Sequence, residues 1–175
     1  YEGQWFQDQQ HGKGIYYFMN NNRYDGMWFQ DYQQGKGTMY YYTGDIYEGD
    51  WVNDKREGQG TYTWKNGSKY EGSWKNDKKE GKGTFVWNDG CKYEGDWKNN
   101  MADGEGVLQM KDGSCYKGHF SKGKEDGKGV LVDKNGVRFD GFFKQGKKHG
   151  AFVETDKDGK IIRKGVYKFG TLDAS

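Results

Sequence analysis

Histidine and cysteine are the residues here whose side chains most readily take part in acid–base, nucleophilic or metal chemistry. The chain has three histidines, His11, His119 and His149, and two cysteines, Cys91 and Cys115. Their spacing offers no C-x-x-C metal pair and no Ser-His-Asp arrangement. We therefore expect no catalytic residues, no metal site and no cofactor, and both cysteines are predicted to be free thiols.

Carboxylates form a second set with regular spacing. Two carboxylates can act as acid and base only when their environments differ. A row of equivalent surface positions does not provide that difference, so we interpret the row as a solvated ladder of weak ion pairs with lysines such as Lys36 and Lys82. Its members, mostly 23 residues apart, are Glu2, Asp25, Glu48, Glu71, Glu94 and Asp140.

The same interval orders the aromatic residues and glycines, and it reveals the elements that position them. An aromatic residue opens each 23-residue unit, glycine follows two places later, and tryptophan or phenylalanine follows two places after that. The opening residues are Tyr1, Tyr24, Tyr47, Tyr70, Tyr93, Tyr116 and Phe139. Most of the 30 glycines fit this frame, and the chain has no proline.

Alternation within the frame predicts β-strands. In residues 70–74 an aromatic residue, glycine and tryptophan alternate with polar residues, and residues 81–87 repeat the pattern, as expected for strands with one polar face. Each unit therefore reads as a β-hairpin. Because the connections are short, successive hairpins should pair as one antiparallel meander of about fifteen strands.

The alternation also predicts a register. A four-residue connection over 76–79 would place Trp74 opposite Gly81. A three-residue connection ending in Gly90 at a positive φ would join this hairpin to the next. Each indole would then lie beside a strand position without a side chain, which is a physical reason for glycine inside a strand.

Composition weakens several classes of protein. Only 32% of residues are hydrophobic, whereas 18% are aromatic and 31% are charged, which suits neither an ordinary two-layer core nor a disordered segment. No stretch approaches the ~20 apolar residues of a membrane-spanning helix. The net charge of +2 gives no general case for nucleic acid, which we do not expect as a partner.

The pattern Tyr-Glu-Gly-x-Trp at 70–74, followed by Gly-x-Gly at 81–83 and an Asp-Gly or Asn-Gly turn, resembles the MORN (membrane occupation and recognition nexus) repeat. The resemblance implies an all-β fold, an elongated single-layer antiparallel meander of stacked 23-residue hairpins. The family includes junctophilins, plant phosphatidylinositol phosphate kinases, radial-spoke head proteins of cilia and cytoskeletal scaffolds of protozoan parasites. In these proteins the repeats bind and space partners.

Seven tandem repeats are expected over residues 1–160, and a degenerate eighth over 161–175 is expected to act as C-terminal cap and tail. In the seventh repeat Phe152 replaces the second glycine of the usual pair. A terminal repeat lacks a neighbour on one side, so atypical residues are expected there.

The aromatic face is the main candidate site. We expect most aromatic side chains to stabilise the sheet, and a subset also to line a groove that binds a helical or extended segment of a protein partner. The predicted groove residues are Trp28, Trp51, Tyr62, Trp64, Tyr70, Trp74, Phe85, Trp87, Tyr93 and Trp97. The chain is thus predicted to be a non-catalytic scaffold in a cytoplasmic cytoskeletal, ciliary or membrane-associated assembly, with a homodimer as one way to cover the face.

Basic residues near the C-terminal end give an alternative function. They would contact phosphoinositides or other anionic lipids at a membrane surface, unless they serve only as solubility devices on edge strands. The candidates are Lys144, Lys147, Lys148, Lys157, Lys160, Arg163 and Lys164. A third alternative is an aromatic platform for sugars or cationic ligands.

Overall fold

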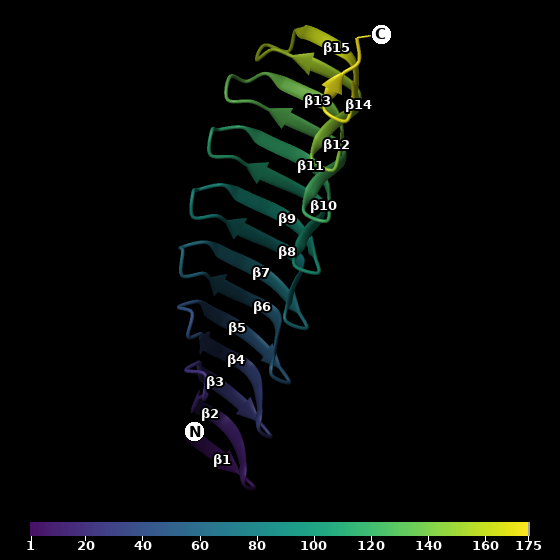
Figure 1. Cartoon of the computed structure of the whole chain (residues 1–175). Helices are drawn as coiled ribbons and strands as arrows, with labels where there is room; N and C mark the ends of the chain where they lie inside the picture. Colours follow the sequence, from purple (N-terminus) through teal and green to yellow (C-terminus); the bar gives the residue numbers. More distant parts are fainter. Residues whose placement is uncertain (175) are drawn as a thin grey trace. The chain divides into compact units, whose positions relative to one another are not determined.

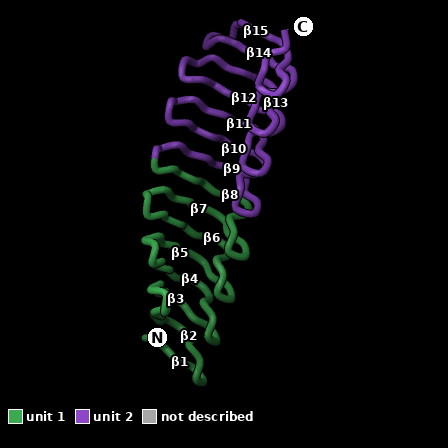
Figure 2. The backbone as a smooth tube through the Cα atoms, in the orientation of Figure 1, with its two compact units in different colours: residues 1–88 green, residues 89–175 purple. Residues whose placement is uncertain are grey.

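The computed structural model describes residues 1–174, which contain sixteen β-strands and no helix (Figure 1). The chain divides into two compact units at Asn88 (Figure 2). The first unit contains β1 (Glu2–Phe6), β2 (Gln9–Tyr17), β3 (Arg23–Phe29), β4 (Tyr32–Tyr40), β5 (Ile46–Val52), β6 (Lys55–Thr63), β7 (Lys69–Lys75) and β8 (Lys78–Val86). The second contains β9 (Lys92–Lys98), β10 (Met101–Gln109), β11 (Cys115–Ser121), β12 (Lys124–Val132), β13 (Arg138–Lys144), β14 (Lys147–Thr155), β15 (Ile161–Lys168) and β16 (Thr171–Leu172).

In each unit, every strand pairs antiparallel with the next strand along the chain. The extensive contacts between strands follow the same order, without crossovers. The predicted all-β, single-layer meander of stacked hairpins is confirmed.

The strand glycines that recur in every repeat leave space for the buried tyrosines. Tyr47 is completely buried, and its hydroxyl donates a hydrogen bond to the carbonyl of Asp50 at 2.9 Å. A Cβ at Gly60 would overlap the Tyr47 phenol oxygen, and a Cβ at Gly49 would lie 2.5 Å from the backbone of β6. Glycine within these strands is therefore a steric requirement of tyrosine packing.

Tryptophans connect one repeat to the previous one. The indole N–H groups of Trp28, Trp51 and Trp74 each donate to a glycine carbonyl 14 residues earlier, at 3.0–3.1 Å. Each indole also packs edge-to-face between two tyrosine rings; Tyr47, for example, lies 5.1 Å from Trp51 and 5.3 Å from Trp74. This continuous row of rings is the core of the single-layer sheet.

The predicted four-residue connection inside each hairpin is wrong. The turn after β7 contains two residues, Asn76 and Asp77, which both have positive φ (48° and 66°) as in a type I′ turn. Trp74 consequently faces Lys79 rather than Gly81, and a β-bulge containing Gly81 (φ 78°) restores the register beyond it. The reason is that asparagine and aspartate tolerate the left-handed conformation, which lets the strands continue up to the turn.

The predicted three-residue connection between hairpins is present in the third repeat. The amide of Trp64 donates to the carbonyl of Ser68 at 2.9 Å, and Gly67 closes the turn onto Trp64 at 2.9 Å. Gly67 has a φ of 90°. Gly90, the residue named in the prediction, has a φ of 92°.

The C-terminal repeats differ in their packing. Phe152, at the glycine position, stacks on Phe139 at 5.1 Å, which is compatible because Phe139 has no hydroxyl to be accommodated. Glu154 follows on the same face, is 7% exposed, and pairs with Arg163 at 2.7 Å. β15 and β16 lie within residues 161–175, whose last residue, Ser175, is outside the described residues. That this segment is a degenerate eighth repeat acting as a cap and tail stays a prediction.

Candidate functional site

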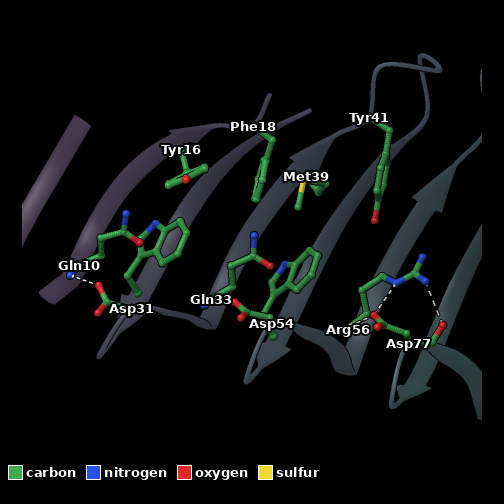
Figure 3. A pocket seen from close by; sticks show the side chains of 12 residues that line it. Gln10, Tyr16, Phe18, Asp31, Gln33, Met39, Tyr41, Asp54, Arg56 and Asp77 are labelled. Carbon is green, nitrogen blue, oxygen red and sulfur yellow. Dashed lines mark hydrogen bonds and ion pairs between the residues drawn. The ribbon is translucent and has the colours of Figure 1, made fainter. Parts of the chain in front are cut away.

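A pocket of about 660 Å³ opens on the aromatic face of the first unit (Figure 3). Apolar side chains lie along one side of it in Figure 3 and polar side chains along the other. The apolar side comprises Tyr16, Phe18, Met39 and Tyr41, the polar side Gln10, Asp31, Gln33, Asp54, Arg56 and Asp77, and the indoles of Trp28 and Trp51 complete the lining. We call this site the aromatic groove.

The apolar side follows the repeat frame. Tyr16 and Phe18 stand at the end of the long strand of the first hairpin, and Met39 and Tyr41 occupy the same positions in the second. Tyr16 and Phe18 contact each other with ring centroids 4.7 Å apart. The groove therefore crosses the strands, and each repeat contributes an equivalent pair of side chains.

The polar side is fixed by hydrogen bonds between repeats. Asp54, the second residue of its turn, accepts a bond from the amide of Gln33 at 2.8 Å, and its own amide donates to the Gln33 carbonyl at 3.2 Å. Asp31 and Asp77 accept the equivalent bonds from the amides of Gln10 and Arg56, at 2.7 and 2.9 Å. A row of carboxylates is thereby held along one edge of the groove.

In the third repeat, an arginine of the chain itself lies against this row of carboxylates. The Nε atom of Arg56 lies 3.1 Å from the Asp77 carboxylate, and its Cζ atom lies 4.7 Å from the ring centroid of Trp74. The equivalent residues in the two earlier repeats are the glutamines Gln10 and Gln33. The groove is thus filled by arginine in one repeat and open in two.

The carboxylates beside the two glutamines have no cation from the described part of the chain itself. No Lys, Arg or His side chain among residues 1–174 forms an ion pair with Asp31 or Asp54. One oxygen of each carboxylate binds a backbone amide. The other is directed to no described cation, so the open stretch is acidic as well as aromatic.

Burial changes the acid–base properties of the surrounding groups. Burial raises the pKa of the Tyr41 hydroxyl; nearby Arg56 opposes this and Asp77 adds to it. Burial, with a smaller effect of Arg56, lowers the pKa of Lys79 to about 8. The Lys79 ammonium lies 5.3 Å from the centroid of Trp64 and 5.1 Å from that of Phe85.

The ten predicted groove residues fall into two groups. Six are no more than 7% exposed and belong to the packed core: Trp28, Trp51, Tyr70, Trp74, Tyr93 and Trp97. Tyr62, Trp64 and Phe85 are half-buried, and Trp87 is 38% exposed. These four continue the two apolar rows of the groove into the third and fourth repeats.

Sequence reasoning missed most of the residues that line the groove over the first two repeats, where glutamine stands in place of arginine. Phe18 and Tyr41 occupy the frame position of Trp64 and Trp87, so the 23-residue period contained the signal for them. The sequence pattern indicated no role for the turn aspartates, because it placed Asp77 inside a four-residue connection. Their role depends on the two-residue turn, which the sequence pattern did not identify.

The seven basic residues proposed for lipid contact do not form one cluster. Lys144 and Lys147 are paired beside the β13–β14 turn. Lys157 and Lys160 lie beyond the other end of β14, in the connection to β15. Lys148 and Arg163 form ion pairs with Glu154, while Lys164 is opposite Val153 on the other face. Contact with anionic lipid stays a prediction.

The remaining chemistry-bearing residues are dispersed. Cys91 and Cys115 are free thiols. Within the described part of the chain no three His, Cys, Asp or Glu side chains are grouped so as to hold a metal ion. The same residues include no helix long and apolar enough to cross a membrane.

Comparison with protein families identifies the repeat. The MORN repeat model matches residues 1–23, 24–46, 47–69, 70–92, 93–115, 116–138 and 139–160. The chain belongs to the MORN repeat family. A comparison with curated protein sequences finds no match.

Solved structures show a related sheet. The SAS-4 (dCPAP) TCP domain of Drosophila melanogaster aligns over 90% of this chain and 84% of its own, with 16% identity and a TM-score of 0.54. The G-box domain of the microcephaly protein CPAP aligns over 90% and 100%, with 11% identity and a TM-score of 0.42. The first of these likenesses supports the single-layer fold.

Proposed function

We propose that this protein is a non-catalytic interaction scaffold that binds an extended segment of a partner protein in the aromatic groove. The observation that carries the proposal is the open stretch over the first two repeats. There, half-buried Tyr16, Phe18 and Tyr41 face a row of carboxylates, and the glutamines leave space that Arg56 takes in the next repeat.

Two findings support an extended occupant in a cytoskeletal or ciliary assembly. Aromatic grooves of this kind suit extended or helical segments held by apolar anchors. The SAS-4 TCP domain, which shares the fold, was solved in complex with a Proline Rich Motif of Ana2. The MORN repeat family includes cytoskeletal scaffolds and radial-spoke head proteins of cilia, and we propose a similar setting for this chain.

Affinity purification from the natural host, followed by mass spectrometry, tests the proposal. The double substitution Phe18→Ala with Tyr41→Ala, and separately Trp64→Ala with Trp87→Ala, should reduce recovery of the partner. The matched control is Thr38→Ala with Thr61→Ala, which changes a pocket of about 610 Å³ on the opposite, polar face. Equal recovery by all three folded variants would overturn the groove as the binding site.

A further inference from the structure

We propose that the occupant of the aromatic groove is a polyproline II segment carrying arginine or lysine at every third residue. One cationic side chain would meet Asp54 and the next would meet Asp31, while the intervening prolines lie against the apolar side. This inference rests on the proposed scaffold function and specifies its partner.

The spacing of the repeats along the groove matches the turn length of a polyproline II helix. Equivalent residues of successive repeats are two strands apart, a distance of about 9.4–9.8 Å. One turn of a polyproline II helix has three residues and a length of about 9.3 Å. An α-helix rises only about 5.4 Å per turn, so it does not keep this step. A polyproline II segment therefore stays in register with the repeats along the groove.

The protein already holds one of its own cations in the way proposed for the partner. Arg56 places its guanidinium over Trp74 and against Asp77, at the distances given above. The equivalent positions one repeat earlier are Gln33 in the second repeat and Asp54 in the turn of the third. A partner arginine beside Asp54 would supply the charge that this repeat does not provide.

The apolar side of the groove presents aromatic rings of the kind that bind proline. Tyr16 and Phe18 form a tilted pair at the end of β2, and Tyr41 repeats the Phe18 position one hairpin later. Proline-rich segments bind grooves lined by such rings, at a low cost in conformational entropy because the polyproline II helix is preformed. Charge and shape therefore favour the same occupant.

Synthetic peptides provide the test. The probe is a capped peptide of four Arg-Pro-Pro units, titrated against the whole chain by calorimetry at low salt. The controls are Arg-Pro-Pro-Pro repeats, which shift the charge period, Arg-Gly-Gly repeats, which remove the rigid helix, and Gln-Pro-Pro repeats, which remove the charge. We expect the first peptide to bind best, and to bind more weakly as salt is added.

Protein variants locate the bound peptide. Asp31→Asn with Asp54→Asn keeps an acceptor oxygen for each backbone amide, and should weaken binding about five- to tenfold through the loss of two partly exposed ion pairs. Glu48→Gln with Glu71→Gln removes the same charge from the polar face and should have little effect. A third variant, Gln33→Arg, should fill the groove as Arg56 does and also weaken binding, with thermal unfolding reporting that the fold is intact.

The outcomes separate the two proposals. No binding of the Arg-Pro-Pro peptide, or equal binding of the Arg-Pro-Pro-Pro peptide, would overturn the polyproline inference. The scaffold function would still stand if the natural partner were lost from the Phe18→Ala, Tyr41→Ala protein. If the peptide binds but Gln33→Arg and the Asp31, Asp54 variant bind it as well as the unchanged protein, the site assignment is wrong.

Discussion

At the scale of single residues, the buried tyrosines combine packing with a specific hydrogen bond. The hydroxyls of Tyr24, Tyr47, Tyr70, Tyr93 and Tyr116 each donate to the carbonyl three residues later, at 2.8–3.0 Å. Burial raises the pKa of every one of these hydroxyls, so they stay protonated donors at a pH at which an exposed tyrosine ionises.

Removing one hydroxyl should lower stability measurably. Tyr70→Phe leaves the carbonyl of Ser73 without its 2.8 Å bond, and we expect the free energy of unfolding to fall by about 1 kcal/mol. Urea titration followed by tryptophan fluorescence gives the value. Tyr42→Phe is the control because Tyr42 is 71% exposed; equal effects of the two substitutions would contradict the assigned role of the bond.

The raised pKa values also predict instability in alkali. In the unfolded chain tyrosine ionises near its ordinary pKa of 10.0, whereas the folded protein holds the proton to higher pH. The stability that depends on the neutral phenols is therefore present below pH 10 and is lost as pH rises above it. Thermal unfolding at pH 9 and pH 11 should show a clear drop, and Tyr70→Phe should make the drop smaller. An unchanged melting temperature would rule this out.

Lys79 should titrate well below an ordinary lysine. Burial is the main cause of its pKa of about 8, and Arg56 contributes. NMR of the reductively methylated protein should show one lysine with a midpoint near 8, missing in Lys79→Arg and moved upward in Arg56→Gln. The stability linked to this shift is present above the unfolded value of 10.5 and is lost as pH falls toward 8. A midpoint near 10.5 would contradict the lowering of this pKa by partial burial.

At the scale of the strands and turns, sequence pattern predicted the hairpins but not every connection. The Tyr, Gly and Trp frame was sufficient for the strands, because the alternation of large and absent side chains allows few registers. The turn at Asn76 and Asp77 was not predictable in this way. A four-residue connection satisfies the same alternation, and the choice depends on local φ preferences and on the bulge at Gly81.

In the candidate site, too, residues of the repeat frame were predictable and residues of the turns were not. Tyr62, Trp64, Phe85 and Trp87 were predicted because they are large and recur in the frame. Asp54 was not found, because its position beside the groove follows from turn length and from its bond to the previous repeat. The difference between the repeats with glutamine and the repeat with Arg56 could be recognised only from side-chain geometry, since glutamine and arginine are both polar in a sequence pattern.

Glycines in the strands should be less replaceable than glycines in the connections. Gly60→Ala places a Cβ against the Tyr47 ring, and we expect a loss of about 2 kcal/mol or more in unfolding free energy. A Cβ at Gly67 would have no atom within 4 Å, so Gly67→Ala is disfavoured only by the positive φ of this residue. We expect it to lower the unfolding free energy by about 1 kcal/mol. Chemical denaturation of both variants checks the order, and a smaller loss for Gly60→Ala would refute the packing explanation.

At the scale of the whole molecule, each unit is stabilised between neighbouring strands. Repeat proteins of this kind approximate a sum of local stabilities and interfaces between neighbours. A substitution in one repeat should therefore act mainly on the strands beside it.

Hydrogen exchange followed by mass spectrometry tests this locality. Gly60→Ala should increase exchange in β5, β6 and β7, where its Cβ disturbs the Tyr47 contact. Exchange in β11 to β14 should stay close to that of the unchanged protein. A uniform increase across residues 1–174 would show instead that the chain unfolds as a single cooperative unit.

The exchange of glutamine for arginine between the second and third repeats has an evolutionary consequence. In the genetic code, glutamine codons become arginine or lysine codons by one nucleotide change. Tandem duplication multiplies the repeat frame, and in the proposed scaffold that one codon would decide whether a new repeat is open to a partner or closed by its own side chain. Under the proposed mode of binding, the length of the recognised segment would grow or shrink by one helical turn at a time, without any change to the tyrosines, glycines and tryptophans that maintain the sheet.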